Sequence, residues 1–376
     1  MAVESARVSI IVPALNEAEN IPLLVPRVDA AMDGRPYEVI IVDDNSRDAT
    51  PVVIKELSKT YPVSLLVRPQ PKDGLSGAVL EGMAKARGDI LVVMDADLQH
   101  PPEKLPDLLA PLDRNEADFV VGSRYVKGGS TEGEWGFFRK INSSVATVLA
   151  RPFAGRTTDP MSGFFALRRE SYCAATRLTP LGYKIGLELM CKCRVQRVKE
   201  IPIHFGLRQK GESKLTIKQQ FKYLEHLSRL YDYTFPRGSP ILKFAIATST
   251  GWLVGFAAYL LFVQSRVLPT STLEPIFAYP FTILTIAVFH LRYVRTQREF
   301  ILRPHPWRDF WMISLMEWAT CAVASLWVTG RVNHLGVLEL FLLTFGAATV
   351  VRYILRKEFL HDIRGLRREF RYEDWT

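Results

Sequence analysis

The sequence predicts a Rossmann-like α/β domain with a mostly parallel sheet, followed by an all-α domain of four transmembrane helices. Up to about residue 240, short β-branched runs alternate with amphipathic stretches of helical period, which is typical of a sheet covered by helices. After that point the chain is dominated by long apolar stretches. A length of 376 residues also exceeds what one hydrophobic core usually serves. We therefore expect three parts, which are the α/β domain at 1–213, an amphipathic interface segment at 214–240 and a membrane domain at 241–376.

The strands of the first domain are recognised as apolar runs rich in valine and isoleucine. They are expected at 8–13, 38–44, 63–69, 89–97 and 118–125. Stretches with apolar residues three or four positions apart predict helices between them, at roughly 17–32, 48–61, 74–87 and 102–113. Gly74 and the pair Pro101 and Pro102 fit helix starts.

Four apolar stretches predict the membrane helices, at 241–264, 275–291, 310–328 and 335–355. The first has only Lys243 as a charge and is long enough to cross a hydrocarbon core of about 30 Å. The third contains Glu317, and the fourth contains Glu339 and Arg352. Such acids either pair with arginines between helices or lie near the membrane interface, and the sequence leaves both possibilities open.

The distribution of basic residues predicts the orientation in the membrane. Five arginines lie in the second connection, 292–309, and six basic residues lie in the tail after 355, whereas the other two connections have one arginine each. By the positive-inside rule we expect a multi-pass protein of the cytoplasmic membrane with its first domain on the cytoplasmic side. Residues 1–20 show no signal-peptide pattern, which agrees. The amphipathic stretch 214–238 either lies along the lipid headgroups or packs on the first domain.

Composition and motifs exclude several classes of protein. The net charge of +9 is compatible with phosphorylated substrates, an anionic membrane or nucleic acid, but no nucleic-acid-binding signature is present, so no such partner is expected. The four cysteines form neither a disulfide framework nor a zinc set and are expected to be reduced. The chain has no glycine-rich phosphate loop and no serine nucleophile elbow, which argues against an NTPase, a dehydrogenase and a serine hydrolase.

Acidic and amide side chains collect where the predicted strands end. The segment "VVMDADLQHPPE" places Asp95, Asp97 and Gln99 directly after the fourth strand, and the first two strands run into "PALNE" and "VDDNS". In an open α/β sheet, ligands bind beyond the carboxyl ends of the strands. Two carboxylates and an amide oxygen suit Mg²⁺ or Mn²⁺, which would take further ligands from substrate phosphates. We therefore expect a metal site formed by these three residues.

Seven segments in order resemble glycosyltransferase family 2, and more closely the polyprenyl (dolichyl) phosphate mannose synthases. They are "IIVPALNEAENI", "VDDNSRDAT", "VVMDADLQHPPE", "GSRYVKGG", "FFRKINS", "DPMSGFFALRR" and "FGLRQKGESKL", covering residues 7–230. The resemblance implies a nucleotide-sugar transferase domain of the GT-A type. It continues more loosely into the four-helix membrane module that some members carry.

The resemblance also implies site residues. The donor would meet Pro13, Leu15, Glu17, Val42, Asp44, Asp95, Ala96, Asp97, Arg124, Arg208 and Lys214. The metal would be held by Asp95, Asp97 and Gln99, and the acceptor would meet Arg139, Ser162, Gly163 and Lys184. Asp97, Arg124 and Arg139 are the expected catalytic residues. One departure is Leu15, which stands where relatives have tyrosine in "PTYNE" and leaves the base, guanine or uracil, open.

The expected activity is inverting transfer of a sugar, mannose from GDP-mannose, onto a polyprenyl phosphate. The lipid phosphate is already an anion, so it needs no general base, and direct attack on an α-linked donor gives a β-linked product. The metal and the cations would manage the charge of two polyanions. The polar stretch 125–136 is either a loop that orders on binding or an ordinary surface loop.

Three alternative functions differ from this expectation in donor or in chemistry. Transfer from UDP-glucose or another UDP-sugar to undecaprenyl phosphate would change only the donor pocket. A non-catalytic scaffold or a flippase for lipid-linked sugars is disfavoured by the clustered acids. A processive polysaccharide synthase is disfavoured because 195–202 lacks the expected "QxxRW" motif. The sequence leaves the polyprenol length and the oligomeric state undetermined.

Overall fold

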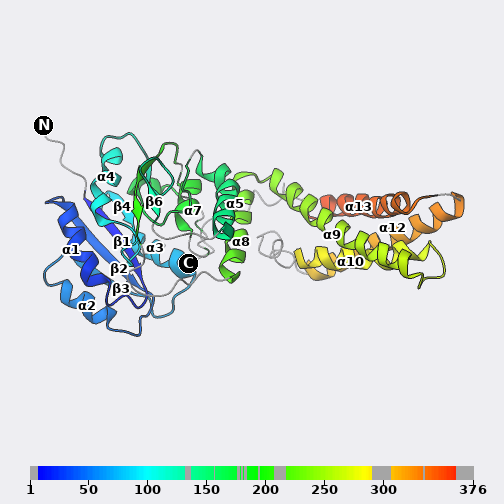
Figure 1. The fold of residues 1–376 in the computed structure, drawn as a ribbon, viewed down its shortest axis with the longest axis horizontal. Helices are drawn as coiled ribbons and strands as arrows, with labels where there is room; N and C mark the ends of the chain where they lie inside the picture. Colours follow the sequence, from blue (N-terminus) through cyan, green and yellow to red (C-terminus); the bar gives the residue numbers. More distant parts are fainter. Residues whose placement is uncertain are drawn as a thin grey trace. The chain divides into compact units, whose positions relative to one another are not determined.

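A computed structural model describes residues 7–131, 137–155, 157–175, 178, 181, 184–193, 195–206, 217–289, 306–332 and 335–360, without the side chains of 137–145, 217–220, 240, 306, 309 and 356–360. The chain divides into two compact units, Met1–Thr234 and Phe235–Thr376. The first contains the strands of the main sheet and the second is helical (Figure 1).

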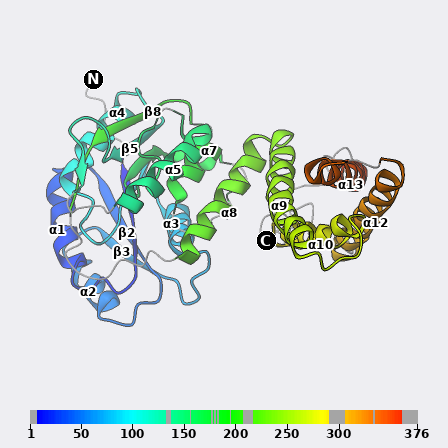
Figure 2. The same ribbon diagram turned by 45° about the vertical axis from the view of Figure 1, so that its right-hand side comes forward.

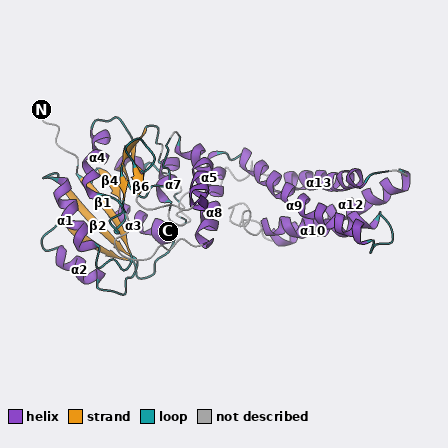
Figure 3. Ribbon diagram, in the orientation of Figure 1, coloured by secondary structure: helices purple, strands orange, loops and turns teal. Residues whose placement is uncertain are grey.

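A seven-stranded, mostly parallel sheet forms the centre of the first unit (Figure 3). Its strands are β1 (Val8–Ala14), β2 (Tyr37–Asp43), β3 (Val63–Val67), β4 (Ile90–Val93), β5 (Phe119–Ser123), β7 (Phe165–Arg168) and β8 (Val198–Pro202). Their order is β3-β2-β1-β4-β7-β5-β8, and β7 is antiparallel to both of its neighbours. The short strands β6 (Ser130–Thr131) and β9 (His204–Phe205) pair separately. The predicted Rossmann-like class is confirmed.

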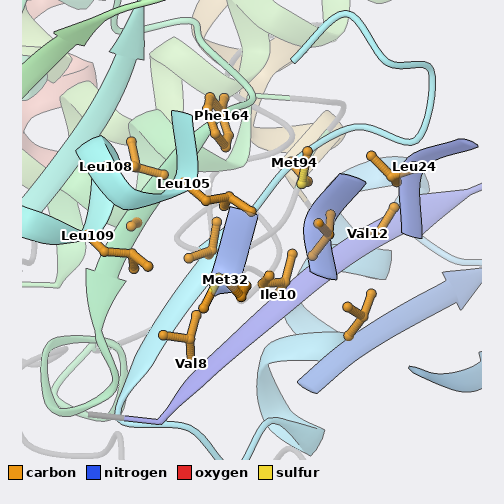
Figure 4. Packing of buried hydrophobic residues seen from close by; sticks show 14 of the residues in the cluster. Val8, Ile10, Val12, Leu24, Met32, Met94, Leu105, Leu108, Leu109 and Phe164 are labelled. Atoms are coloured by element: carbon orange, nitrogen blue, oxygen red, sulfur yellow. The ribbon is translucent and has the colours of Figure 1, made fainter. Parts of the chain in front are cut away.

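Two hydrophobic clusters cover the two faces of this sheet. Alternate residues of β1 point to opposite sides, so Val8, Ile10 and Val12 enter one cluster and Ile11 enters the other. The first cluster packs against α1 (Ile21–Met32), α2 (Thr50–Leu57) and α4 (Leu105–Asp113), and Figure 4 shows its side chains. The second packs against α3 (Gly74–Lys85), α5 (Phe137–Ala154), α7 (Ile185–Lys192) and α8 (Ile217–Thr234). Burial on both faces explains why these strands read as continuous apolar runs.

The fourth strand is shorter than predicted, and this changes the geometry of the acids that follow it. We expected a strand over 89–97, but β4 ends at Val93. The chain then turns, with Leu98 in the left-handed region at φ +63° and the Gln99 N–H donating to Asp97 Oδ1 (3.2 Å). This local hydrogen bond replaces the strand ladder. Asp95 and Asp97 therefore lie in a turn and not at the end of the longer strand that the sequence predicted.

The other predicted strands and helices of the first domain are present with shifts at their ends. Helix α3 begins at Gly74 as expected, and the region after Pro101 opens with the short 3₁₀ helix η1 (Pro102–Lys104) before α4. The helix α6 (Arg169–Cys173) and the strands β7 and β8 were not predicted. All four cysteines lie among the described residues and form no disulfide.

Helix α8 is the amphipathic stretch for which the sequence left two placements open. One face packs on the first unit, where Leu227 and Leu230 are buried in the second cluster. The Tyr223 hydroxyl also donates to the carbonyl oxygen of Ala146 on α5 (2.9 Å). Phe221 and Leu224 lie on the exposed side of the helix. The packing of α8 on the first domain is therefore observed, and an apolar surface remains on the other side of the helix.

The described residues of the second unit form four helices that pack side by side (Figure 2). They are α9 (Gly238–Ser265), α10 (Leu273–Phe289), α12 (Pro306–Arg331) and α13 (Val337–Leu360). Three segments of the described residues, Ile241–Ser265, Phe310–Arg331 and Val337–Leu355, are long and apolar enough to cross a membrane, and α10 is a shorter apolar helix. These helices make the protein membrane-associated. The second connection and the tail, on which the predicted orientation depends, lie largely outside the described residues.

Two close contacts between helices of the second unit are informative. Arg352 Nε on α13 lies 3.3 Å from Glu317 Oε1 on α12, and both side chains are buried. Of the two possibilities for Glu317, pairing with an arginine between helices is the one observed. Gly255 on α9 lies where a Cβ would overlap Thr282 Oγ1 of α10 and would come within 2.7 Å of a Phe345 ring atom. A small residue at this crossing lets the two backbones approach.

Candidate active site

Three loops at the carboxyl ends of β1, β2 and β4 build the site. Each contains a residue other than glycine in the left-handed region, namely Asn16, Asn45 and Leu98. The first two loops are tied together, because the Asn16 N–H donates to Ser46 Oγ (2.8 Å) and the Arg47 N–H donates to Asn16 Oδ1 (2.9 Å). Unusual backbone conformations that the surroundings hold in place often mark functional sites.

Asp95, Asp97 and Gln99 line the turn after β4. The Gln99 side-chain amide donates through Nε2 to the Gly206 carbonyl oxygen (3.0 Å), so Oε1 is the atom that Gln99 can offer to a cation. About a third of the Asp95 side chain is exposed, whereas Asp97 is buried. Within the described residues, no three His, Cys, Asp or Glu side chains gather closely enough to bind a metal by themselves. Two carboxylates and one amide oxygen fit a hard divalent cation that also binds substrate phosphate.

His100 fixes the backbone of this turn. Its Nδ1 accepts a hydrogen bond from the Asp95 N–H (3.0 Å), so the proton of the neutral ring is assigned to Nε2. The ring stacks on Phe164 with 5.4 Å between centroids, and it is almost fully buried. Burial lowers the pKa of His100, and the nearby Asp95 and Asp97 carboxylates only partly oppose this. The geometry therefore gives His100 a positioning role.

Two cations, Arg124 and Lys184, lie close enough to Asp95 to interact with its charge. The Arg124 guanidinium, at the end of β5, binds both carboxylate oxygens of Asp159 (2.7 Å each). Burial opposes its charge, but the hydrogen bonds and charge of Asp159 outweigh burial and raise the pKa of Arg124. Lys184 caps the start of α7 and donates to the Met161 carbonyl oxygen (2.8 Å). Burial, together with the charge of Arg124, lowers the pKa of Lys184 to about 8.

Of the residues expected to line the nucleotide base and ribose, only some reach the surface of the site. Leu15 is exposed on the first loop, and Pro13 and Glu17 are partly exposed nearby. Asp44 is held by Arg68, whose Nη1 lies 2.5 Å from Asp44 Oδ1, and burial raises the pKa of Asp44 against the opposing effect of Arg68. Val42, in contrast, has no exposed surface and packs under α3, so its side chain does not reach the site surface.

The segment 157–163 packs directly against the turn 95–99. The Ser162 hydroxyl donates to the Gly122 carbonyl oxygen (2.7 Å), which ties the segment to β5. A Cβ built on Gly163 would lie 3.2 Å from His100 Cε1 and 3.3 Å from Asp95 Oδ2. Ala96 is buried in the same turn. The segment 157–163 therefore forms one wall of the site.

Some predicted residues lie outside what the structure describes, and others were missed by sequence reasoning. Arg208 and Lys214 are outside the described residues, as is the side chain of Arg139 on α5. The predicted loop 125–136 is described only to Thr131. Sequence reasoning missed Arg68, Asp159 and Phe205. Arg68 could have been found in the sequence as a charged residue at the end of a predicted strand. Asp159 could have been found as an acid in a segment that contains proline and glycine.

Comparisons with known proteins give the family of this chain. Residues 9–175 match the family described as Glycosyl transferase family 2. The chain is 45% identical over 261 residues to a dolichol-phosphate mannosyltransferase of Pyrococcus furiosus, covering 69% of this chain and 73% of the relative. It is 40% identical over 249 residues to the Saccharomyces cerevisiae dolichol-phosphate mannosyltransferase, covering 63% and 92%.

Among solved structures, the chain aligns with glucosyl-3-phosphoglycerate synthase from Mycobacterium tuberculosis in complex with Mn²⁺, uridine diphosphate and phosphoglyceric acid. The TM-score is 0.47 and the sequence identity is 22%. The alignment covers 61% of this chain and 79% of that chain.

The fold, the acidic turn after β4 and the sequence relatives define a glycosyltransferase. The chain belongs to glycosyltransferase family 2 and, within it, to the dolichol-phosphate mannosyltransferases, as the sequence motifs indicated.

Proposed function

We propose that this protein transfers mannose from GDP-mannose to a polyprenyl phosphate of the dolichyl phosphate class, forming a β-linked lipid phosphomannose. The observation that carries the proposal is the turn 95–99 after β4, which contains two carboxylates and an amide and whose Asp95 interacts electrostatically with Arg124 and Lys184. The dolichol-phosphate mannosyltransferases that this chain resembles supply the sugar and the lipid class. Guanine as the base follows from that class.

Asp95, Asp97 and Gln99 would hold Mg²⁺ or Mn²⁺. The orientation of the Gln99 amide, with Nε2 bound to Gly206, supports this assignment because it leaves the oxygen Oε1 as the atom that Gln99 can offer to a cation. When bound, the metal would stabilise the negative charge that develops on the departing nucleoside diphosphate. His100 holds the Asp95 backbone in place and thereby the geometry of the turn.

The transfer needs charge stabilisation more than proton transfer. A phosphate oxygen of the acceptor attacks the anomeric carbon of the sugar, the bond from that carbon to the GDP oxygen breaks, and GDP leaves with the electron pair. The attacking oxygen carries no proton, so no side chain has to act as a base. Arg124 and Lys184, with Arg139, Arg208 and Lys214 from the sequence motifs, would bind the donor and acceptor phosphates. Attack from the opposite face inverts the anomeric carbon.

The remaining assigned residues would bind the two substrates. Pro13, Leu15, Glu17 and Asp44 lie on the first two loops and would line the base and ribose, with Val42 supporting them from below. Ser162 and Gly163 would form the acceptor wall with Lys184 beside them. The aliphatic, exposed Leu15 favours a second candidate to be tested in parallel, which is a UDP-sugar donor with the same chemistry.

We place the catalytic unit on the cytoplasmic side of the membrane, with four crossings by α9, α10, α12 and α13. The apolar composition of the helices and the arginine-rich second connection support this topology. The membrane would then keep the polyprenyl chain of the acceptor dissolved beside the enzyme.

The test is transfer of labelled sugar to a short polyprenyl phosphate in detergent. Donors are GDP-mannose and UDP-glucose, each with Mn²⁺, with Mg²⁺ and with EDTA, for the wild type and Asp97→Ala. Asp107→Ala, an exposed acid on α4, is the matched control. We expect metal-dependent transfer from GDP-mannose that Asp97→Ala abolishes and Asp107→Ala keeps. Transfer only from UDP-glucose would select the second candidate, and an α-linked product would refute the inverting displacement.

A further inference from the structure

Asp159 is a buried acid in direct contact with Arg124, a residue of the proposed reaction, and no role was assigned to it from the sequence. Its Oδ2 accepts from Arg124 Nε (2.7 Å) and from the Arg124 backbone N–H (3.1 Å), and its Oδ1 accepts from Nη2 (2.7 Å). About 1% of the Asp159 side chain is exposed. A bidentate contact of this kind fixes both the plane and the direction of a guanidinium group.

A second layer of hydrogen bonds holds Asp159. Glu200 on β8 accepts the Asp159 N–H (3.0 Å) and the Thr158 hydroxyl (2.9 Å) through Oε1, and the Thr158 N–H (3.0 Å) through Oε2. The Thr158 and Ser123 hydroxyls lie 3.1 Å apart, which connects this layer to the residue just before Arg124. The backbone of Asp159 is therefore anchored to β8 through Glu200, and its carboxylate is bound to Arg124 just after β5.

Aromatic rings complete the enclosure of Arg124. Its guanidinium carbon lies 5.3 Å from the ring centroid of Tyr125 and 5.2 Å from that of Phe205. Phe205 in turn contacts the His100 ring, with 5.4 Å between centroids. Phe205 thus packs on both Arg124 and His100, the residue that holds the Asp95 backbone. A small displacement of Arg124 or His100 would therefore shift the other through Phe205.

We propose that Asp159 is a positioning residue that holds the Arg124 guanidinium toward the substrate phosphates, with Glu200 holding Asp159 in place. The inference rests on the proposed function, in which Arg124 binds a phosphate. Asp159 does not touch the reacting atoms. A buried ion pair is weak evidence for stability, because removing both charges from water is costly. Phosphate stabilisation depends on preorganised donors, so the position of the guanidinium matters for the reaction. This requirement explains why Asp159 is held both at its carboxylate and at its backbone.

The first experiment compares Asp159→Asn with Asp118→Asn. Asp118 lies just before β5 and binds Arg197 (2.8 Å), so the control removes an acid paired with arginine from the opposite end of the same strand. We expect Asp159→Asn to lower kcat/KM for sugar transfer by about 10- to 100-fold, in line with misplacement of one phosphate-binding group, with most of the loss in kcat. Asp118→Asn should stay within twofold of the wild type. Equal activity of Asp159→Asn and the wild type would overturn the inference.

Two further variants separate positioning from a merely structural role. If Asp159 acts through Arg124, adding Asp159→Asn to Arg124→Ala should change kcat/KM by less than twofold, because the group to be positioned is gone. The same fold loss with and without Arg124 would refute the proposal. Glu200→Gln keeps the side-chain shape and serves where Asp159→Asn does not fold. We expect it to lower kcat/KM several-fold, and unchanged activity would contradict the role of the second layer.

The controls also distinguish failure of this inference from failure of the proposed function. Absence of mannosyl transfer by the wild type, or full activity of Asp97→Ala, would refute the proposed function whatever Asp159→Asn does. An active wild type and an inactive Asp97→Ala, together with a fully active Asp159→Asn, would refute only the positioning role of Asp159.

Discussion

Gly163→Ala tests whether the segment 157–163 sets the position of the Asp95 side chain. A methyl group at this position would lie 3.3 Å from Asp95 Oδ2 and 3.2 Å from His100 Cε1, closer than ordinary van der Waals contact. His100 is almost fully buried and stacked on Phe164, so it has little room to move. The Asp95 side chain is about one third exposed and can swing toward solvent. We therefore expect the variant to displace the Asp95 carboxylate by a few tenths of an ångström.

The size of the effect follows from this displacement. A misplacement of about 1 Å at a reacting centre costs on the order of 100-fold in rate, so a few tenths should cost roughly 5- to 10-fold in kcat. Overpacking a protein interior typically costs about 1 to 3 kcal/mol of unfolding free energy, and the partly exposed Asp95 places this variant at the low end. Activity should therefore fall much more than stability.

The assay measures kcat at saturating donor, the affinity for Mn²⁺ by calorimetry, and the thermal midpoint. Gly206→Ala is the steric control, because among the described residues a Cβ at that position has only the Leu98 carbonyl oxygen within 4 Å, at 3.9 Å. Wild-type kcat and wild-type Mn²⁺ affinity in Gly163→Ala would refute the argument. A large loss of the thermal midpoint that accounts for the lost activity would refute it as well.

Three further predictions concern charge and helix packing. Lys184 has a pKa of about 8 and loses its charge as the pH rises, so kcat/KM for the acceptor should fall above about pH 8, and Lys184→Arg should remove this limb from the profile. Glu317→Gln should lower the unfolding free energy in detergent by about 3 kcal/mol or more because it leaves the buried Arg352 charge uncompensated, whereas the double variant Glu317→Leu/Arg352→Met should unfold close to the wild type. Gly255→Leu should lower the thermal midpoint by several degrees through overlap with Thr282, and an unchanged midpoint would contradict the close helix approach.

Local sequence patterns predicted much of the secondary structure of this protein. Apolar runs over 8–13 and 38–44 predicted β1 and β2 to within one residue at each end, because a buried parallel strand needs continuous apolar side chains. The helix start at Gly74 and the apolar helices of the second unit followed from similarly local rules. The acids at the strand ends indicated the edge of the sheet where the site lies, because ligands bind beyond the carboxyl ends of parallel strands.

Only the tertiary structure decided how distant residues combine at that edge. The antiparallel strand β7 enters between β4 and β5 and brings the segment 157–163 against Asp95. Arg124 meets Asp159 across 35 positions of the chain, and Gln99 meets Gly206 across 107. Such contacts depend on the packing of whole elements and leave no periodic trace in either segment. Composition and period therefore predicted the strands and helices up to β5 and the apolar helices of the second unit, while long-range packing determined which distant side chains meet at the edge of the sheet.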